Sequence, residues 1–169
     1  MIIVVMGVCG CGKTTVAQKL ATRTGSPFVE GDDLHPAANK KKMSSGVALG
    51  DDDRWPWLDA IAAKAAALST ENNCVVVSCS ALKRTYRQRL QSSNETTLFV
   101  HLTGARSLLE QRTAGRRDHF MPAGLLGSQL VTLEPPGPDE NALTLDIATE
   151  PDRLVAEIQK YLDDRDRKL

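Results

Sequence analysis

Residues 7–14 read Gly-Val-Cys-Gly-Cys-Gly-Lys-Thr and follow an apolar run, Ile2–Met6, of the kind that forms a buried parallel strand. The stretch matches the pattern G-x-x-x-x-G-K-[ST] at every fixed position, and an amphipathic helical pattern over Lys13–Thr22 follows it. In such a loop the backbone N–H groups surround phosphate oxygens, and the helix N-terminus adds a favourable dipole. The sequence therefore predicts a site for a nucleoside triphosphate, although a glycine-rich turn without a ligand is the simpler alternative.

Two residues of this phosphate-binding loop (P-loop) have roles of their own. The Lys13 ammonium is expected at the β- and γ-phosphates, where it also serves catalysis, and the Thr14 hydroxyl is expected to bind Mg²⁺. The full set of expected nucleotide-binding residues is Gly7, Val8, Cys9, Gly10, Cys11, Gly12, Lys13, Thr14 and Thr15.

Composition excludes several other classes of protein. Among 169 residues, 21 Lys and Arg balance 21 Asp and Glu, which argues against a general nucleic-acid binder and against a polybasic membrane anchor. No apolar run approaches the roughly 20 residues of a membrane helix, and the first basic residue follows the opening apolar run, unlike in a signal peptide. The four cysteines lie in or beside apolar runs, as reduced thiols do. We therefore expect one domain, residues 1–169, in the cytoplasm.

Strand and helix patterns alternate along the chain. Strands are expected at 2–6, 28–29, 74–79, 97–102 and 142–146, and the last helix is expected to follow an N-cap at Thr149 with Asp152 as its capping-box partner. This alternation predicts a three-layer α/β fold with a five-stranded parallel sheet and right-handed crossovers. Ligands of such sheets bind beyond the carboxyl ends of the strands, so functional residues are expected directly after each strand.

The residues after the strands favour a small-molecule kinase. The chain has neither D-x-x-G nor the [NT]-K-x-D signature of a GTPase, and the strand at 74–79 runs into Ser80 where a motor or AAA-type ATPase usually has Asp. Glu30-Gly31-Asp32-Asp33 follows the second strand instead. A carboxylate there can face the γ-phosphate and orient an attacking hydroxyl, a role we expect of Asp32. The alternative for both Asp32 and Asp33 is that they cap the helix after Pro36.

Collinear segments covering most of the chain resemble the P-loop gluconate kinase family. They are residues 6–15; 30–36 with Asn39, Lys42 and Met43; 46–58; 79–84 with Tyr86 and Arg87; 116–122; 125–130; and 132–135. The resemblance implies a helical lid at about 113–124, a homodimer, and transfer of phosphate from ATP to D-gluconate, giving 6-phospho-D-gluconate and ADP. Cys9 and Cys11 stand where Ser is expected, Glu30 where Asp is usual, Asp118 where Gly is usual, and Leu130 where Phe is usual.

The remaining site residues are assigned on this basis. Gluconate is an anion, and Arg offers the forked cation that binds a carboxylate, so Arg54 is expected to bind it, with a surface ion pair to the preceding aspartates as the alternative. The resemblance adds His35, Lys83 and His119, beside Asp32, as substrate-binding residues. Arg112 and Arg116, on and next to the basic lid, are expected to stabilise the charge of the transferred phosphoryl group.

Two alternatives remain open at this point. One is a shikimate-like or nucleotide kinase of the same fold, although the Gly-Gly-Gly and Gly-Tyr-Pro-Arg strings of those kinases are absent. The other is a nucleotide-binding regulatory module without catalysis, against which Lys13, Thr14 and Asp32 argue.

Overall fold

The computed structural model describes residues 1–91, 96–114 and 124–167. Its centre is a five-stranded sheet in which all strands run parallel, in the order β2-β3-β1-β4-β5. The strands are β1 (Ile2–Met6), β2 (Phe28–Glu30), β3 (Val75–Ser78), β4 (Thr97–Thr103) and β5 (Ala142–Asp146). The predicted fold class is confirmed, and every strand boundary lies within one residue of its expected position.

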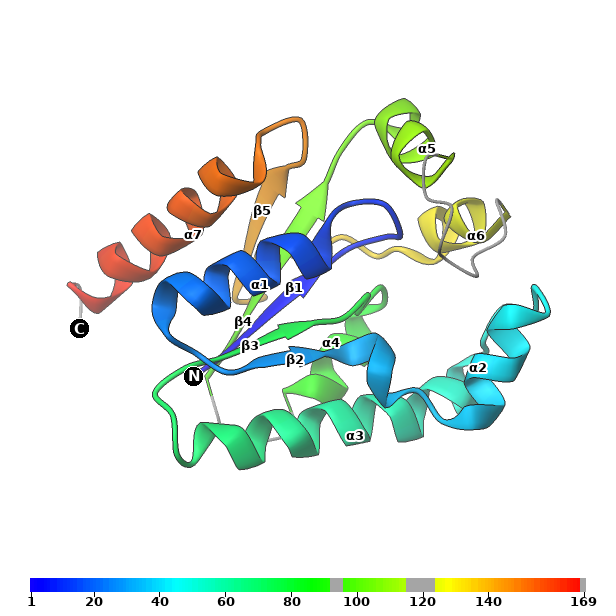
Figure 1. Cartoon of the computed structure of the whole chain (residues 1–169), viewed down its shortest axis with the longest axis horizontal. Coiled ribbons are helices and arrows are strands. Elements are labelled where there is room, and N and C mark those ends of the chain that lie inside the picture. The colour runs from blue at the N-terminus through cyan, green and yellow to red at the C-terminus, as the bar shows by residue number, and fades with distance from the viewer. Residues whose placement is uncertain (92–95, 115–123, 168–169) are drawn as a thin grey trace.

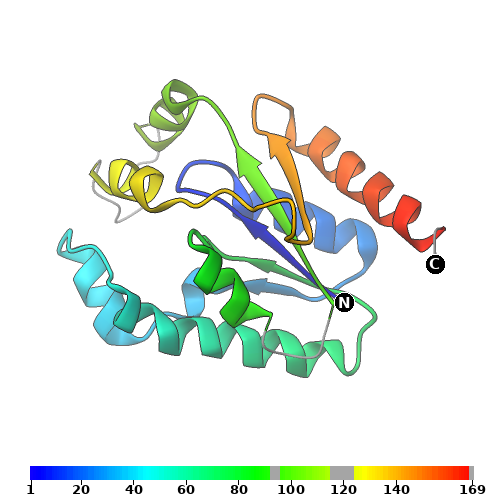
Figure 2. The same cartoon turned by 180° about the vertical axis from the view of Figure 1, so that it is seen from behind.

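Helices cover both faces of the sheet and so produce three layers (Figure 1, Figure 2). Helices α1 (Lys13–Thr24) and α7 (Pro151–Asp166) pack on one face, and α3 (Asp51–Ser69) and α4 (Arg84–Leu90) pack on the other. A short 3₁₀ helix, η1 (Gly31–Leu34), follows β2 directly. The other helices, α2 (Ala37–Ser44), α5 (Arg106–Ala114) and α6 (Gly124–Thr132), gather at the end of the molecule to which the strands point.

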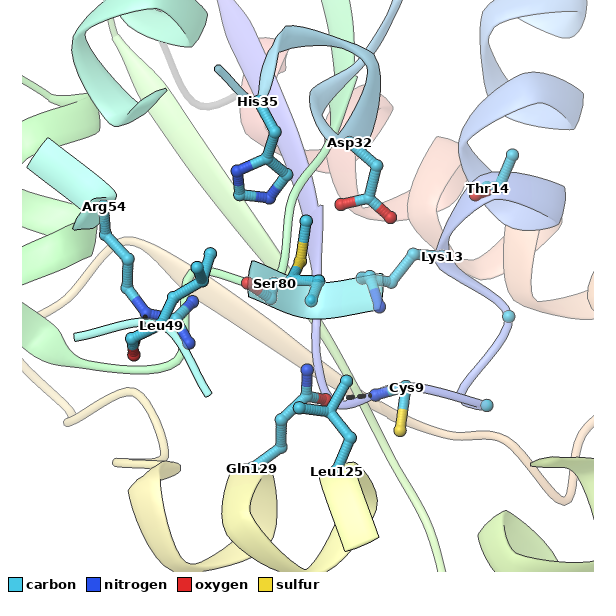
Figure 3. A pocket seen from close by; sticks show the side chains of 13 residues that line it. Cys9, Lys13, Thr14, Asp32, His35, Leu49, Arg54, Ser80, Leu125 and Gln129 are labelled. Atoms are coloured by element: carbon cyan, nitrogen blue, oxygen red, sulfur yellow. Dashed lines mark hydrogen bonds between the residues drawn. The ribbon is translucent and has the colours of Figure 1, made fainter. Parts of the chain in front are cut away.

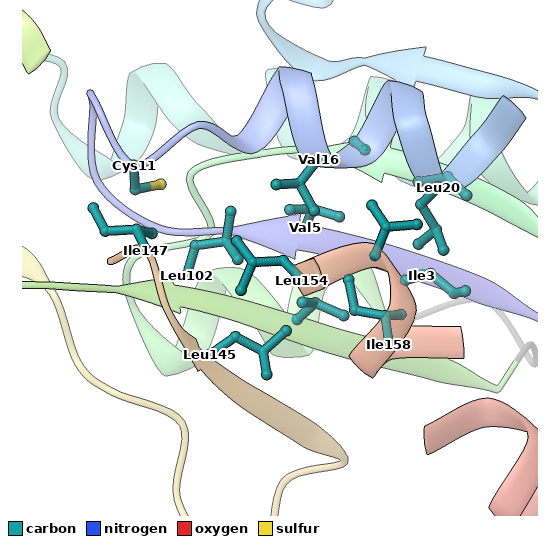
Figure 4. Close-up of a cluster of buried hydrophobic side chains, with 14 of the residues drawn as sticks. Ile3, Val5, Cys11, Val16, Leu20, Leu102, Leu145, Ile147, Leu154 and Ile158 are labelled. Carbon is teal, nitrogen blue, oxygen red and sulfur yellow. The ribbon is translucent and has the colours of Figure 1, made fainter. Parts of the chain in front are cut away.

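The central strand β1 supplies both halves of the core. Ile3 and Val5 pack with Leu20 of α1 on one face (Figure 4), whereas Ile2 and Val4 belong to the cluster under α3 and α4. Because β1 is buried on both faces, its sequence is a continuous apolar run with no alternation, as the parallel-sheet prediction requires.

The start of the last helix differs from the prediction. Glu150, not Thr149, is the N-cap of α7, no side chain caps the helix, and Pro151 occupies its first turn. Proline suits that position because its ring presets the helical φ and its missing N–H would have no partner there. This shift of one residue leaves Thr149 outside the helix, beside the P-loop.

Two expectations concern the periphery of the molecule. Within the described residues, no helix combines the length and the apolar character that a membrane crossing requires. Most of the expected lid at 113–124 falls on residues 115–123, which lie outside the described part of the chain. Arg116, Asp118 and His119 are among these residues.

Candidate active site

The P-loop connects β1 to α1 in a conformation that depends on glycine. Gly7 and Gly12 have φ values of 142° and 90°, which side chains disfavour. A Cβ atom on Gly7 would also lie 2.6 Å from the carbonyl oxygen of Leu102 on β4. Lys13 bends back over the loop, and its Nζ donates a hydrogen bond to the carbonyl oxygen of Val8 at 3.1 Å. The start of the loop therefore packs closely against β4, and the Lys13 side chain extends back over the loop.

A pocket lies in front of the loop at the carboxyl ends of the strands (Figure 3). Its lining residues are Cys9, Gly10, Gly12, Lys13, Thr14, Asp32, His35, Met43, Leu49, Arg54, Ser80, Leu125 and Gln129. Asp32 and His35 approach it from η1, and Leu125 and Gln129 from α6 on the opposite side. The pocket thus brings together predicted site residues from the P-loop, from η1 and from α3, and adds Ser80 and residues of α6.

Glu30 connects the P-loop to the neighbouring strands. Its Oε2 accepts a hydrogen bond from the Thr14 hydroxyl at 2.8 Å, and its Oε1 accepts one from the Ser78 hydroxyl at the end of β3. The backbone N–H of Asp32 donates to the same Oε1 at 3.4 Å. A carboxylate at the end of β2 therefore lies next to the hydroxyl expected to bind Mg²⁺.

His35 is held in a fixed orientation beside Asp32. Its ring stacks on Trp57 with a centroid separation of 4.1 Å, and the Trp57 indole donates to the carbonyl oxygen of Gly31 at 2.7 Å. Asn39 Nδ2 donates to the carbonyl oxygen of Asp53 at 2.7 Å and lies 3.4 Å from His35 Nδ1. Since an amide nitrogen only donates, this contact favours the tautomer in which His35 Nδ1 accepts and Nε2 carries the ring hydrogen.

Burial determines the charge of this histidine. The residue is only 7% exposed, and burial, together with the positive charges of Arg54 and Lys40, lowers the pKa of His35 to about 4. His35 is therefore neutral at physiological pH and presents a hydrogen-bond donor at the pocket.

The Arg54 guanidinium is not neutralised by the aspartates that precede it. Asp51 accepts hydrogen bonds from Lys83 and Tyr86, and Asp53 pairs with Lys42 at 2.6 Å. Among the described residues no carboxylate pairs with Arg54, whose Nε donates to the carbonyl oxygen of Leu49 at 3.4 Å. The geometry thus leaves the fork of Arg54 at the pocket, available to an anionic ligand.

Lys83 occupies a different environment from the one expected. It is not among the residues that line the pocket, and its Nζ lies 2.8 and 3.0 Å from the two carboxylate oxygens of Asp51. Its ammonium also lies 5.5 Å from the centre of the Tyr86 ring. In this arrangement Lys83 holds the first turn of α3, and a contact with substrate would require it to leave Asp51.

Arg112 lines a second pocket, which shares Gly10 and Gly12 with the first. The other lining residues are Cys11, Thr15, Val16, Thr149, Glu150, Pro151 and Leu154. Arg112 Nη2 donates to the carbonyl oxygen of Ile147 at 2.9 Å, which ties α5 to the segment that follows β5. The structure therefore places Arg112 with the loop before α7, apart from Asp32 and Arg54.

The two P-loop cysteines point in different directions. Cys11 is 1% exposed, and its thiol packs in the core near Leu102 and Ile147 (Figure 4). Cys9 is half-buried and lines the main pocket. Of these two residues, Cys11 is enclosed in the core, whereas Cys9 is partly exposed at the pocket.

Sequence reasoning missed two polar residues of the main pocket. Ser80 follows β3 directly, so the rule that ligands bind beyond strand ends pointed to it. Gln129 had no such signal, because α6 follows no strand and its sequence is mostly apolar. Its side-chain Oε1 accepts a hydrogen bond from the backbone N–H of Cys9 at 2.6 Å.

Comparisons with known proteins agree with this arrangement. A family model described as an AAA domain matches residues 3–121. A gluconokinase of Gluconobacter oxydans (strain 621H) is 45% identical over 164 residues, which cover 97% of this chain and 92% of the relative. The crystal structure of a gluconokinase from Sinorhizobium meliloti 1021 has a TM-score of 0.81 at 44% identity and covers 96% of this chain and 95% of that one.

An unliganded sugar kinase from Janibacter sp. HTCC2649 is also similar in structure. It has a TM-score of 0.91 at 42% identity, with 96% of this chain and 94% of that chain covered. The likeness therefore extends over the P-loop, the sheet and the helices at the strand ends, and over nearly the whole length of these relatives.

Proposed function

This chain belongs to the gluconokinase family, and we propose that it is a kinase that transfers the γ-phosphoryl group of ATP to D-gluconate, giving 6-phospho-D-gluconate and ADP. The observation that carries the proposal is that one pocket is lined by the P-loop lysine Lys13, the Asp32 carboxylate and, on the opposite side, the Arg54 fork, which no carboxylate of the described residues pairs with. A P-loop alone fits many reactions, whereas the arginine adds a place for an anionic acceptor.

Arg54 binds the carboxylate of the acceptor in this proposal. A guanidinium forms two parallel hydrogen bonds with a carboxylate, and Arg54 lies across the pocket from Lys13 (Figure 3). An extended six-carbon acid bound in this way points its far end toward the P-loop. That orientation places the 6-hydroxyl, at the opposite end from the carboxylate, at the donor phosphate.

Lys13 and Asp32 carry out the transfer. The Lys13 ammonium leaves the carbonyl of Val8 and neutralises charge on the phosphates, together with the N–H groups of the loop. Asp32 accepts a hydrogen bond from the attacking hydroxyl and aligns its oxygen with phosphorus. Since an alcohol is a very weak acid, the proton moves to Asp32 late, and orientation is the main contribution of this residue.

Thr14 and Glu30 fit a Mg²⁺ site. Within the described residues, no cluster of three or more His, Cys, Asp or Glu side chains could hold a metal, and Mg²⁺ bound to a nucleotide needs only one or two protein ligands beside phosphates and water. The Thr14 hydroxyl would hold the ion, with the Glu30 carboxylate beside it to accept hydrogen bonds from its waters. When bound, the ion neutralises charge on the β- and γ-phosphates.

The second pocket is proposed to hold the nucleoside of ATP. It lies against the same P-loop glycines and includes Arg112, Thr149 and Pro151. A planar guanidinium can stack on a base, and a proline ring offers an apolar surface beside it. Arg112 is therefore reassigned from the phosphoryl group to the nucleoside, whereas Arg116 and His119 stay predictions because they lie outside the described residues.

Three further expectations are kept as proposals. One domain over 1–169 and a lid at 113–124 are consistent with the collinear match to full-length relatives. A cytoplasmic location is supported by the four cysteines, none of which forms a disulfide. A homodimer follows only from the family resemblance, and size-exclusion chromatography with light scattering would test it.

A coupled assay of ADP release tests the proposed function. The acceptors are D-gluconate, other six-carbon sugar acids, shikimate and nucleoside monophosphates, each with Mg-ATP. We expect kcat/KM for D-gluconate to exceed that for shikimate by about 100-fold or more. Shikimate also carries a carboxylate for Arg54, but its compact ring cannot extend a hydroxyl from there to the P-loop as the six-carbon chain of gluconate does. The Lys13→Ala variant is the matched control and should keep less than a tenth of the turnover.

The outcomes separate the alternatives. Preference for shikimate or a nucleoside monophosphate would replace the proposal with another kinase of the same fold. Tight binding of Mg-ATP without phosphorylation of any acceptor would favour a regulatory module.

A further inference from the structure

Gln129 joins α6 to the P-loop across 120 residues of sequence. Its side chain is 9% exposed, and its Oε1 lies 2.6 Å from the backbone N of Cys9. Leu125, one helical turn earlier, lines the same pocket, so this face of α6 forms one wall of the site (Figure 3).

This hydrogen bond determines the orientation of the Gln129 amide. The backbone N–H of Cys9 can only donate, so the atom that faces it must be the acceptor Oε1. The amide nitrogen Nε2 is consequently turned away from the loop, and Figure 3 shows it pointing into the pocket toward Ser80. In the part of the chain that the structure describes, no residue accepts a hydrogen bond from Nε2.

The other groups of the pocket indicate which ligand atom Nε2 serves. The loop N–H groups of Gly7, Cys9 and Cys11 already have acceptors, so the remaining loop N–H groups, with Lys13 once it leaves Val8, serve the phosphate oxygens. The Arg54 fork is available for the acceptor carboxylate. Between these charged ends, a polyhydroxy acid presents a row of neutral hydroxyl groups. A neutral amide donor suits a hydroxyl oxygen and, unlike a cation, competes for neither of the anionic groups.

We infer that Gln129 is a substrate-binding residue, whose Nε2 donates a hydrogen bond to a chain hydroxyl of the sugar acid while its Oε1 holds the P-loop. The inference rests on the proposed function and adds to it a residue that reads the neutral part of the acceptor. Because one planar amide makes both contacts, it sets the distance between the acceptor and the phosphate loop. Removal of the side chain affects binding of the acceptor and alignment of the two substrates.

A double cycle that combines an enzyme variant with deoxygenated substrate analogues tests the inference. The enzymes are wild type and Gln129→Met, which keeps the length and removes both polar atoms. The acceptors are D-gluconate and its four monodeoxy analogues at C2, C3, C4 and C5. For one of these hydroxyls, we expect deoxygenation to lower the wild-type kcat/KM by about three- to tenfold and to have no further effect in Gln129→Met.

Further measurements make the result specific. The KM for D-gluconate should rise about three- to tenfold in Gln129→Met, with less than a twofold change in the KM for ATP. Gln159→Met is the matched control, since Gln159 lies on α7 outside the lining of the pocket and hydrogen-bonds Asp163, and its kinetics should equal those of wild type. If Gln129→Met folds poorly, Gln129→Asn replaces it as the test variant. Asparagine keeps the amide but is too short for both contacts, so the same changes in KM and in the deoxy-acid series are expected.

Two results would overturn the inference. If each deoxy acid lowers kcat/KM by the same factor in both Gln129 variants as in wild type, no chain hydroxyl contacts Gln129. A rise in the KM for ATP that exceeds the rise for gluconate would assign Nε2 to a phosphate oxygen instead. Neither result bears on the proposed function, which stands or falls on whether wild type phosphorylates D-gluconate.

Discussion

Acid should destabilise this protein through His35, and the structure allows the size of the effect to be worked out. His35 is stacked on Trp57, accepts a hydrogen bond from Asn39 and is 7% exposed. Its pKa is lowered from 6.5 to about 4, first by burial and then by the positive charges of Arg54 and Lys40. A proton on this ring would have to remain in an apolar, positively charged environment.

The sign of the effect follows from the two pKa values. Between pH 6.5 and pH 4 the histidine binds a proton in the unfolded chain but not in the folded protein, so protonation favours unfolding. The stability conferred by the neutral ring is fully present above pH 6.5 and is lost as the pH falls toward 4. With these two pKa values, proton linkage lowers the free energy of unfolding by about 2 kcal/mol between pH 7 and pH 5. The loss reaches about 3 kcal/mol at a pH well below both values.

Urea unfolding at pH 7 and pH 5 measures this quantity in wild type and His35→Gln. Because the other titrating groups are shared, the difference between the two pH-dependences isolates His35. Wild type should lose about 2 kcal/mol more than the variant on going from pH 7 to pH 5.

A direct titration provides a second readout. The ring proton resonances of His35 should stay constant by NMR from pH 8 down to about pH 5. An equal loss of stability in both proteins, or a titration midpoint near 6.5, would refute the reasoning and place the ring in contact with water.

Other predictions concern the active site. Asp32→Asn should lower kcat by about 100-fold or more, and Asp33→Asn by less than about threefold, because only Asp32 lines the pocket; similar losses in steady-state assays would reject this asymmetry. Arg54→Lys should raise the KM for gluconate about tenfold and the KM for ATP much less, since lysine keeps the charge but loses the fork; the reverse order would move Arg54 to the nucleotide. Iodoacetamide should inactivate wild type and Cys11→Ser but not Cys9→Ser, with protection by Mg-ATP, because the Cys11 thiol is buried; inactivation that persists in Cys9→Ser would locate the reactive thiol elsewhere.

The local parts of this protein could be read directly from its sequence. The P-loop could be identified because all of its functional residues are adjacent in the sequence. Its glycines permit backbone angles that other residues avoid, so the loop has a recognisable pattern. The central strands β1, β3 and β4 were placed to within one residue because burial on both faces produces continuous apolar runs. The start of α7 was misplaced at Thr149, since a hydroxyl that can cap a helix competed with Pro151, and the rigid φ of proline prevailed.

The direction of individual side chains could not be read in this way. Cys9 and Cys11 are two residues apart in the same loop, and sequence reasoning treated them alike. In the structure Cys11 is buried in the core under α1, whereas Cys9 is partly exposed and is among the residues that line the pocket. A tight loop has no regular period that would fix the direction of its side chains, so only the packed neighbours show which residue is buried.

Contacts between distant segments depended on the tertiary structure alone. Glu30 meets Thr14 and Ser78 because the strand order places β2 beside β3, and Gln129 meets Cys9 because α6 packs at the end of the sheet. The sequence by itself determined the phosphate-binding loop, the alternation of strands and helices and the charged residues at strand ends, since each depends on a few adjacent residues. The partners of those residues were decided by the order of the strands and the docking of the helices, because hydrogen bonds and burial act between atoms that are close in space, whatever their separation along the chain.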